Sequence, residues 1–185
     1  MVATYRDDKS VSRRNGRILA VQALYAWDVG SSPLEDLLSF EWTKRMAHSD
    51  ELIPKPNAPK DKSAQAKTAA VQDETQAEQE HEELSPSRKL EMDFARLLVT
   101  GTVSRIAEID KRIKSHLAEG WEFDRLDRVT LAILRTSVFA LLWQRDVSST
   151  IVIDEAIAIS KAFALDDSFK FINAILDTIA KEETT

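Results

Sequence analysis

No proline follows Pro86 in this 185-residue sequence, and glycine is scarce along its whole length. The chain contains only 4 Gly and 5 Pro, a combined share well below the roughly 12% of average proteins. Proline interrupts helices, and the tight turns between strands use glycine, so this composition favours long helices. Because 43% of the residues are hydrophobic, such helices have enough apolar surface to share a core. The sequence therefore predicts an all-α protein, a compact helical bundle.

Apolar residues recur at helical spacings in six segments. Ser32, Pro33 and Glu35 form the pattern of a capping box, and Gly30 and Gly120 stand where helices commonly end. We expect Gly101 to bend the third helix. The start of the fifth, Ile151-Val152-Ile153, also suits a strand, but no partner strand is evident. Helix starts are expected at residues 12, 33, 86, 124 or 127, 151 and 168, and the corresponding ends at about 29, 48, 117, 143, 164 and 179.

One stretch, residues 54–83, differs in composition from the rest of the chain. It contains a single large apolar side chain, Val71, no aromatic residue, and more acidic than basic residues. Such a segment cannot bury enough apolar surface to offset the entropy lost on ordering. We therefore expect an acidic, low-complexity insertion that is disordered, or alternatively an exposed Ala/Glu helix. The remainder of residues 1–185 is expected to form one helical domain.

The residues that usually carry catalysis are absent or badly placed. The chain has no Cys, and its three histidines are His48, His81 and His116. Glu78 and His81 have the spacing of one half of a di-metal motif, but such sites need two motifs facing a bundle core. No glycine-rich phosphate loop and no Gly-x-Ser-x-Gly motif occurs. We therefore predict that the chain is not an enzyme and binds no cofactor and no metal.

No segment is apolar enough to cross a membrane. The longest stretch without a charged residue is 18–27, whereas a spanning helix needs about 20 apolar residues. The polar N-terminus has no signal-peptide pattern, and the lack of Cys fits a reducing compartment. These features predict a cytoplasmic protein with no membrane partner.

Basic residues gather near the N-terminus of a chain whose net charge is −6. Arg14 and Arg17 fall about 100° and 40° from Arg13 on a helical wheel, so all three share one side. Arginine binds phosphate with two hydrogen bonds, and a nearby aromatic such as Tyr25 can stack on an unpaired base. The plainer reading is a solvated basic cap with Tyr25 in the core. The second half of this helix is apolar on most sides and is expected to lie deep in the bundle.

Four blocks of the sequence resemble the NusB family of bacterial transcription antitermination factors. The first block is the basic helix itself, and the other three follow in the family's order. In sequence letters they are RRNGRILAVQALYAW at 13–27, AILRTSVF at 132–139, IDEAI at 153–157 and DSFKFINAILD at 167–177. The resemblance spans nearly the whole chain apart from its first ten residues and the 54–83 stretch.

The resemblance implies two small helical bundles and an RNA-binding adaptor. NusB-like proteins bind the single-stranded boxA element of nascent ribosomal RNA together with NusE, a ribosomal protein, in the RNA polymerase antitermination complex. Carried over by position, the RNA-binding residues would be Arg13, Arg14, Arg17, Gln22, Tyr25, Asp167, Lys170, Phe171 and Asn173.

Plainer roles remain open for several of these residues. Lys170 is then an exposed charge, Phe171 a core aromatic, Asn173 a capping residue and Asp167 only an N-cap. The alternative function is a helical protein–protein adaptor that does not touch RNA. A third reading, an accessory domain of an rRNA cytosine methyltransferase, lacks a catalytic Cys and a cofactor-binding βαβ unit in this chain.

Asn15 and Gly16 interrupt what is often a denser basic run in the family. Glycine inside a helix costs about 1 kcal/mol relative to alanine. We therefore expect the basic turn to fray in the absence of RNA. Ala174 stands where the family commonly has glycine.

Overall fold

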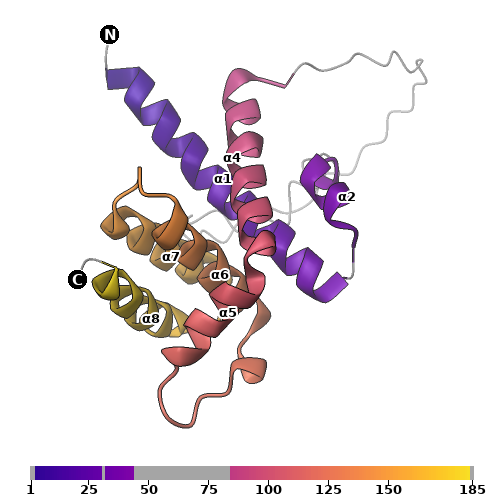
Figure 1. The fold of residues 1–185 in the computed structure, drawn as a ribbon. Coiled ribbons are helices and arrows are strands. Elements are labelled where there is room, and N and C mark those ends of the chain that lie inside the picture. The colour runs from indigo at the N-terminus through magenta and orange to yellow at the C-terminus, as the bar shows by residue number, and fades with distance from the viewer. Residues whose placement is uncertain (1–2, 31, 44–83, 184–185) are drawn as a thin grey trace, which may run out of the picture.

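The computed structural model describes residues 3–30, 32–43 and 84–183, and these form helices (Figure 1). Within the described ranges no residue is in a β-strand, which confirms the predicted all-α fold. The expected insertion at residues 54–83 lies outside the described residues. The elements are α1 (Ala3–Gly30), α2 (Leu34–Ser39), α4 (Pro86–Ser104), α5 (Ile106–Ser115), the 3₁₀ turn η1 (Phe123–Arg125), α6 (Arg128–Trp143), α7 (Ser149–Phe163) and α8 (Ser168–Glu182).

Three helix starts follow the local signals in the sequence. The side chain of Ser85 accepts a hydrogen bond from the Arg88 backbone N–H at 3.3 Å and caps α4. Asp127 accepts one from the Thr130 N–H at 3.0 Å and caps α6. Ser148 caps α7 through the Ile151 N–H, so the strand reading of that segment is wrong. Each cap satisfies a backbone donor that the helix itself leaves unpaired.

The prediction for α2 is wrong at its start, and the helix is interrupted at Phe40. The Ser32 capping box does not form: Pro33 is the N-cap residue, and no side chain caps the helix. Helix α2 ends at Ser39, because Phe40 adopts a left-handed backbone with φ 56° and is completely buried. Residues 42 and 43 are helical again, and the predicted end near residue 48 lies outside the described residues. The Leu37 carbonyl then accepts from the Phe40 backbone N–H and from Trp42 Nε1, at 3.3 and 3.0 Å. Tertiary burial of Phe40 therefore ends α2.

The expected bend at Gly101 is also wrong. The break lies at Arg105, between α4 and α5, and not at the glycine. A Cβ atom on Gly101 would lie 2.0 Å from the ring of Phe139 on α6. Gly101 therefore serves close packing between α4 and α6.

Helix α6 lies at the centre of the molecule. All its residues from Thr130 to Ala140 are buried. Helices α1 and α4 pack on each other and on α6, whereas α7 and α8 pack on each other and on α6. One hydrophobic core draws side chains from all of these helices and from α2 and α5. In this arrangement α1 crosses α4, and the N-terminal end of α1 extends away from that crossing (Figure 1).

Among the described helices, none is long and apolar enough to cross a membrane. The described residues also contain no group of three or more His, Cys, Asp or Glu side chains that could hold a metal ion.

Candidate nucleic-acid interface

The N-terminal half of α1 places two arginines at the surface. Arg14 is exposed and makes no hydrogen bond or ion pair with any described residue. Arg13 is partly exposed, and its Nη2 lies 3.6 Å from Asp146 Oδ2 on the exposed loop between α6 and α7. An exposed ion pair of this kind contributes little, about 0–1 kcal/mol, so Asp146 does not lock the guanidinium in place. Arg13 also lies 5.9 Å from the ring centre of Phe94 on α4.

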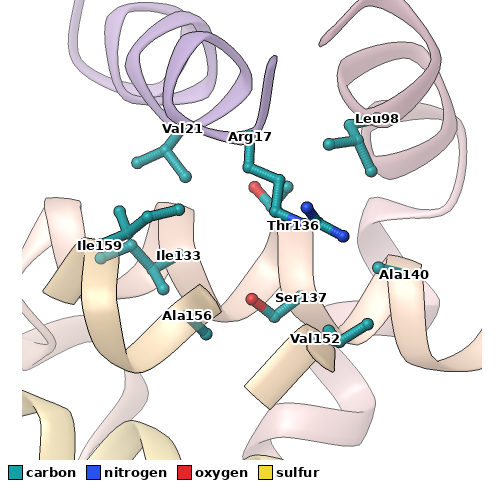
Figure 2. Close-up of a pocket in the computed structure, with 10 residues that line it drawn as sticks. All are labelled: Arg17, Val21, Leu98, Ile133, Thr136, Ser137, Ala140, Val152, Ala156 and Ile159. Atoms are coloured by element: carbon teal, nitrogen blue, oxygen red, sulfur yellow. The ribbon is translucent and has the colours of Figure 1, made fainter. Parts of the chain in front are cut away.

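The structure does not place Arg17 at the surface, which corrects the wheel-based prediction. Its exposed fraction is 7%, and the side chain reaches from α1 into the space between α4, α6 and α7 (Figure 2). Its guanidinium carbon lies 5.3 Å from the ring centre of Phe94. The helical wheel put it on the basic side, but that side of α1 is covered at this level by neighbouring helices. The small cavity beside Arg17 is lined by Val21, Leu98, Ile133, Thr136, Ser137, Ala140, Val152, Ala156 and Ile159.

Burial lowers the pKa of the Arg17 guanidinium from its ordinary value. The negative charge of Glu155 on α7 opposes this shift, and the positive charge of Arg13 adds to it. Glu155 Oε2 is itself buried and has no hydrogen-bond partner among the described residues. Arg17 and Glu155 therefore interact through the interior of the bundle, where Arg17 holds α1 against α4 and α7.

Asn15 and Gly16 have a packing role that the sequence did not reveal. A Cβ atom on Gly16 would lie 2.8 Å from the Glu91 carbonyl oxygen and 2.9 Å from the Phe94 ring. Asn15 Nδ2 donates a hydrogen bond of 2.7 Å to Glu91 Oε1. Glycine thus allows α1 and α4 to approach closely, as small residues do at tight helix crossings. The expected fraying is wrong, because α1 is continuous through this turn.

Gln22 and Tyr25 lie further along α1. Gln22 is half-buried, and Tyr25 is 41% exposed, so its ring is not a core aromatic. Leu19, Ala20, Ala23 and Leu24 are buried, but no residue of α1 from Tyr25 onward is buried, so the prediction that this half of α1 lies deep in the bundle is confirmed only up to Leu24. Tyr25 remains accessible at the edge of that buried face.

An ion-pair network that sequence reasoning missed fixes the C-terminal end of α1. Asp28 accepts hydrogen bonds from Arg128 at 3.0 Å and Arg135 at 3.1 Å, both on α6. Arg135 also donates two parallel hydrogen bonds of 2.8 Å to Asp110 on α5. Burial acts to lower the pKa of Arg135, but the hydrogen bonds and charges of Asp110 and Asp28 outweigh it and raise the pKa. No sequence pattern indicated this network, because its oppositely charged partners are far apart in the chain.

The second predicted group lies at the start of α8. Asp167 is the N-cap residue of α8, as predicted, but it has a left-handed backbone with φ 67° and its side chain makes no capping hydrogen bond. Its carboxylate instead pairs with Lys170 Nζ at 2.7 Å, and both side chains are largely exposed. Asn173 is exposed one turn further on. Phe171 is partly buried and stacks on Trp121, a residue that sequence reasoning did not select.

The two groups do not meet in the structure. Helix α1 packs mainly on α4 and α6, and α8 packs on α7 and α6. No ring contact among the described residues joins Tyr25 to Phe171. A single-stranded ligand would therefore contact the two groups at separate points along its length.

Comparisons with known proteins agree with this architecture. The NusB family model matches residues 57–181. A protein of Treponema denticola named transcription antitermination protein NusB is 41% identical, covering 92% of this chain and 96% of its own. One of the same name from Geobacter sp. (strain M21) is 35% identical, covering 94% and 97%.

Solved structures share the fold. The T. maritima NusB structure is 26% identical with a TM-score of 0.60, covering 92% of this chain and 91% of its own. A structure of the antitermination factors NusB and NusE in complex with dsRNA has a TM-score of 0.60 at 22% identity, covering 92% and 97%. At that identity the likeness concerns the fold alone.

Proposed function

The chain belongs to the NusB family, and from this membership we propose that it is an RNA-binding transcription antitermination factor and not an enzyme. It binds the boxA element of nascent ribosomal RNA together with NusE, within the RNA polymerase antitermination complex. The name of the Treponema denticola relative supports the antitermination role. The surface chemistry of α1 supports the RNA contact.

The observation that carries the RNA contact is the exposed pair Arg13 and Arg14. Arg14 has no ion pair with any described residue, and Arg13 has only a weak exposed one. Guanidinium groups donate two parallel hydrogen bonds to phosphate, and such charge-assisted bonds are stronger than neutral ones. In a chain of net charge −6, long-range attraction does not favour nucleic acid. Binding therefore depends on local contacts at this end of α1.

The remaining predicted residues divide by their position. Tyr25 offers an accessible ring for a base, and half-buried Gln22 offers a polar contact on the same helix. Lys170 and Asn173 are exposed, and Lys170 forms only a weak exposed ion pair with Asp167. Arg17 is a positioning residue, because its buried side chain fixes α1 and cannot reach a phosphate.

A binding titration tests the proposal. The full chain is mixed with a boxA-like RNA or with a scrambled RNA of equal length, each in the presence and absence of NusE. The wild type is expected to prefer boxA, and NusE is expected to tighten that binding. Arg14→Gln is expected to weaken binding about 10-fold or more, as for the loss of one charge-assisted hydrogen bond worth about 1.5–3 kcal/mol.

Lys111→Gln on α5 is the matched control, since it also removes one exposed positive charge. It is expected to leave RNA affinity unchanged. If the wild type binds NusE but neither RNA, the chain is a protein–protein adaptor and the proposal fails. If Lys111→Gln weakens binding as much as Arg14→Gln, the attraction is a matter of net charge and not of the α1 site.

A further inference from the structure

The loop between α5 and η1 carries an exposed tryptophan that is held in a fixed position. Trp121 is 54% exposed, yet its ring stacks on Phe171 of α8, with ring centres 4.6 Å apart and planes at 16°. The turn before it is set by Gly120, which has φ 86°, a conformation that other residues adopt only under strain. The Trp121 backbone N–H donates to the Ala118 carbonyl at 3.1 Å and closes this turn. The ring is therefore both exposed and positioned.

Among the described residues, Phe171 is the one aromatic ring that stacks on the indole. Phe171 packs against the hydrophobic core and supports the indole. Among the described residues no other ring contacts Trp121, and just over half of the Trp121 surface, 54%, stays exposed beside the stack. A flat apolar ring exposed in this way is unfavourable in water, and it is the surface on which nucleobases stack.

We propose that Trp121 is a stacking platform for an unpaired RNA base, with Phe171 as its support. This deepens the proposed function and rests on it. It also changes the role of Phe171: the phenylalanine orients the indole and does not itself meet the base. The exposed cation Lys170 precedes Phe171 on the first turn of α8, where it can contact the phosphate of the stacked nucleotide. The platform therefore recognises single-stranded RNA.

Substitution of Trp121 tests the platform through single-strand affinity. Trp121→Leu keeps an apolar cover on Phe171 but removes the aromatic plane, and Trp121→Phe keeps a ring. We expect Trp121→Leu to weaken binding of single-stranded boxA-like RNA about 5- to 150-fold, the range for loss of one base–aromatic stack. Trp121→Phe is expected to retain most of the affinity, and binding of double-stranded RNA is expected to stay unchanged.

The salt dependence separates this proposal from the one above. Stacking releases no counterions, so Trp121→Leu is expected to keep the wild-type slope of log affinity against log salt, whereas Arg14→Gln lowers it by about 0.7, the value for one phosphate contact with a single strand. Phe163→Leu is the control, since Phe163 is 41% exposed and has no ring partner among the described residues. It is expected to bind RNA as the wild type does.

Tryptophan fluorescence gives a second readout. Single-stranded RNA is expected to quench emission in the wild type and to quench it less in folded Trp121→Phe. The platform is overturned if Trp121→Leu keeps the wild-type RNA affinity and Trp121→Phe keeps the wild-type quenching. If Arg14→Gln still changes the slope of log affinity against log salt, the proposed function stands. Unchanged RNA affinity with weaker NusE binding would make this loop a protein contact and overturn the platform as well. No RNA binding by the wild type would end both.

Discussion

Because α1 and α4 approach closely at Gly16, we predict that Gly16→Ala lowers the stability of the protein, whereas a Gly→Ala change in a helix usually raises it. In an exposed helix, Gly→Ala stabilises by about 1 kcal/mol, because alanine loses less backbone entropy. At Gly16 the added Cβ would lie 2.8 Å from a backbone oxygen of α4 and 2.9 Å from Phe94. A backbone atom cannot rotate away, so the helices must separate. Overpacking of this kind costs about 1–3 kcal/mol.

The two effects leave Gly16→Ala less stable by about 1 kcal/mol, with helix propensity recovering part of the overpacking loss. Urea unfolding followed by circular dichroism measures this as a lower transition midpoint with an unchanged denaturant slope. Gly30→Ala is the control at the other end of α1. Its nearest atom would be the Ser32 side-chain oxygen at 3.5 Å, an ordinary contact, so it is expected to be neutral or stabilising.

A second consequence concerns binding. The ring of Phe94 lies beneath both Arg13 and Arg17, so a shift of this ring in Gly16→Ala moves the basic end of α1. RNA affinity is expected to fall together with stability. If Gly16→Ala stabilises the protein as Gly30→Ala does, the close α1–α4 contact is wrong, and with it the explanation of why the family's basic run is interrupted here.

Two further predictions concern buried arginines. Arg135→Met leaves Asp28 and Asp110 without their main partner and is expected to lower the free energy of unfolding by about 3 kcal/mol. This is the lower end of the loss expected for a broken buried ion pair, because both carboxylates keep some exposure. A loss below about 1 kcal/mol in urea unfolding would show that the network is dispensable. Arg17→Met keeps the packed stem but leaves the buried Glu155 carboxylate without the opposite charge of Arg17, so the free energy of unfolding is expected to fall by about 1–3 kcal/mol and RNA affinity to fall less than in Arg14→Gln. An affinity loss equal to that of Arg14→Gln would show that Arg17 reaches RNA.

Local signals explain which parts of the fold were predictable. Ser85, Asp127 and Ser148 cap helices within one turn of themselves, so their neighbours in sequence were enough to place α4, α6 and α7. The end of α2 was not predictable, because burial of Phe40 depends on helices that are distant in sequence. The capping-box pattern at Ser32 was present in the sequence but was not used.

In the candidate site, too, only the residues whose position depends on local sequence could be predicted. Exposure of Arg14 followed from the wheel, but burial of Arg17 on the same side depends on α4, α6 and α7, which a single helix pattern does not contain. Gly16 and Gly101 looked like interruptions and proved to be contact points for Glu91, Phe94 and Phe139. The stack of Trp121 on Phe171 joins residues of different elements, and no short-range pattern links them.

The proposed contact of Arg13 and Arg14 with RNA phosphates is best tested through the salt dependence of binding. Binding of boxA-like RNA is measured over a range of salt concentrations for the wild type and for the double variant Arg13→Gln/Arg14→Gln. Each lost phosphate contact lowers the slope of log affinity against log salt by about 0.7 for single strands. We expect a slope smaller by about 1.4 in the double variant, with circular dichroism unchanged. An identical slope in the two proteins would contradict it.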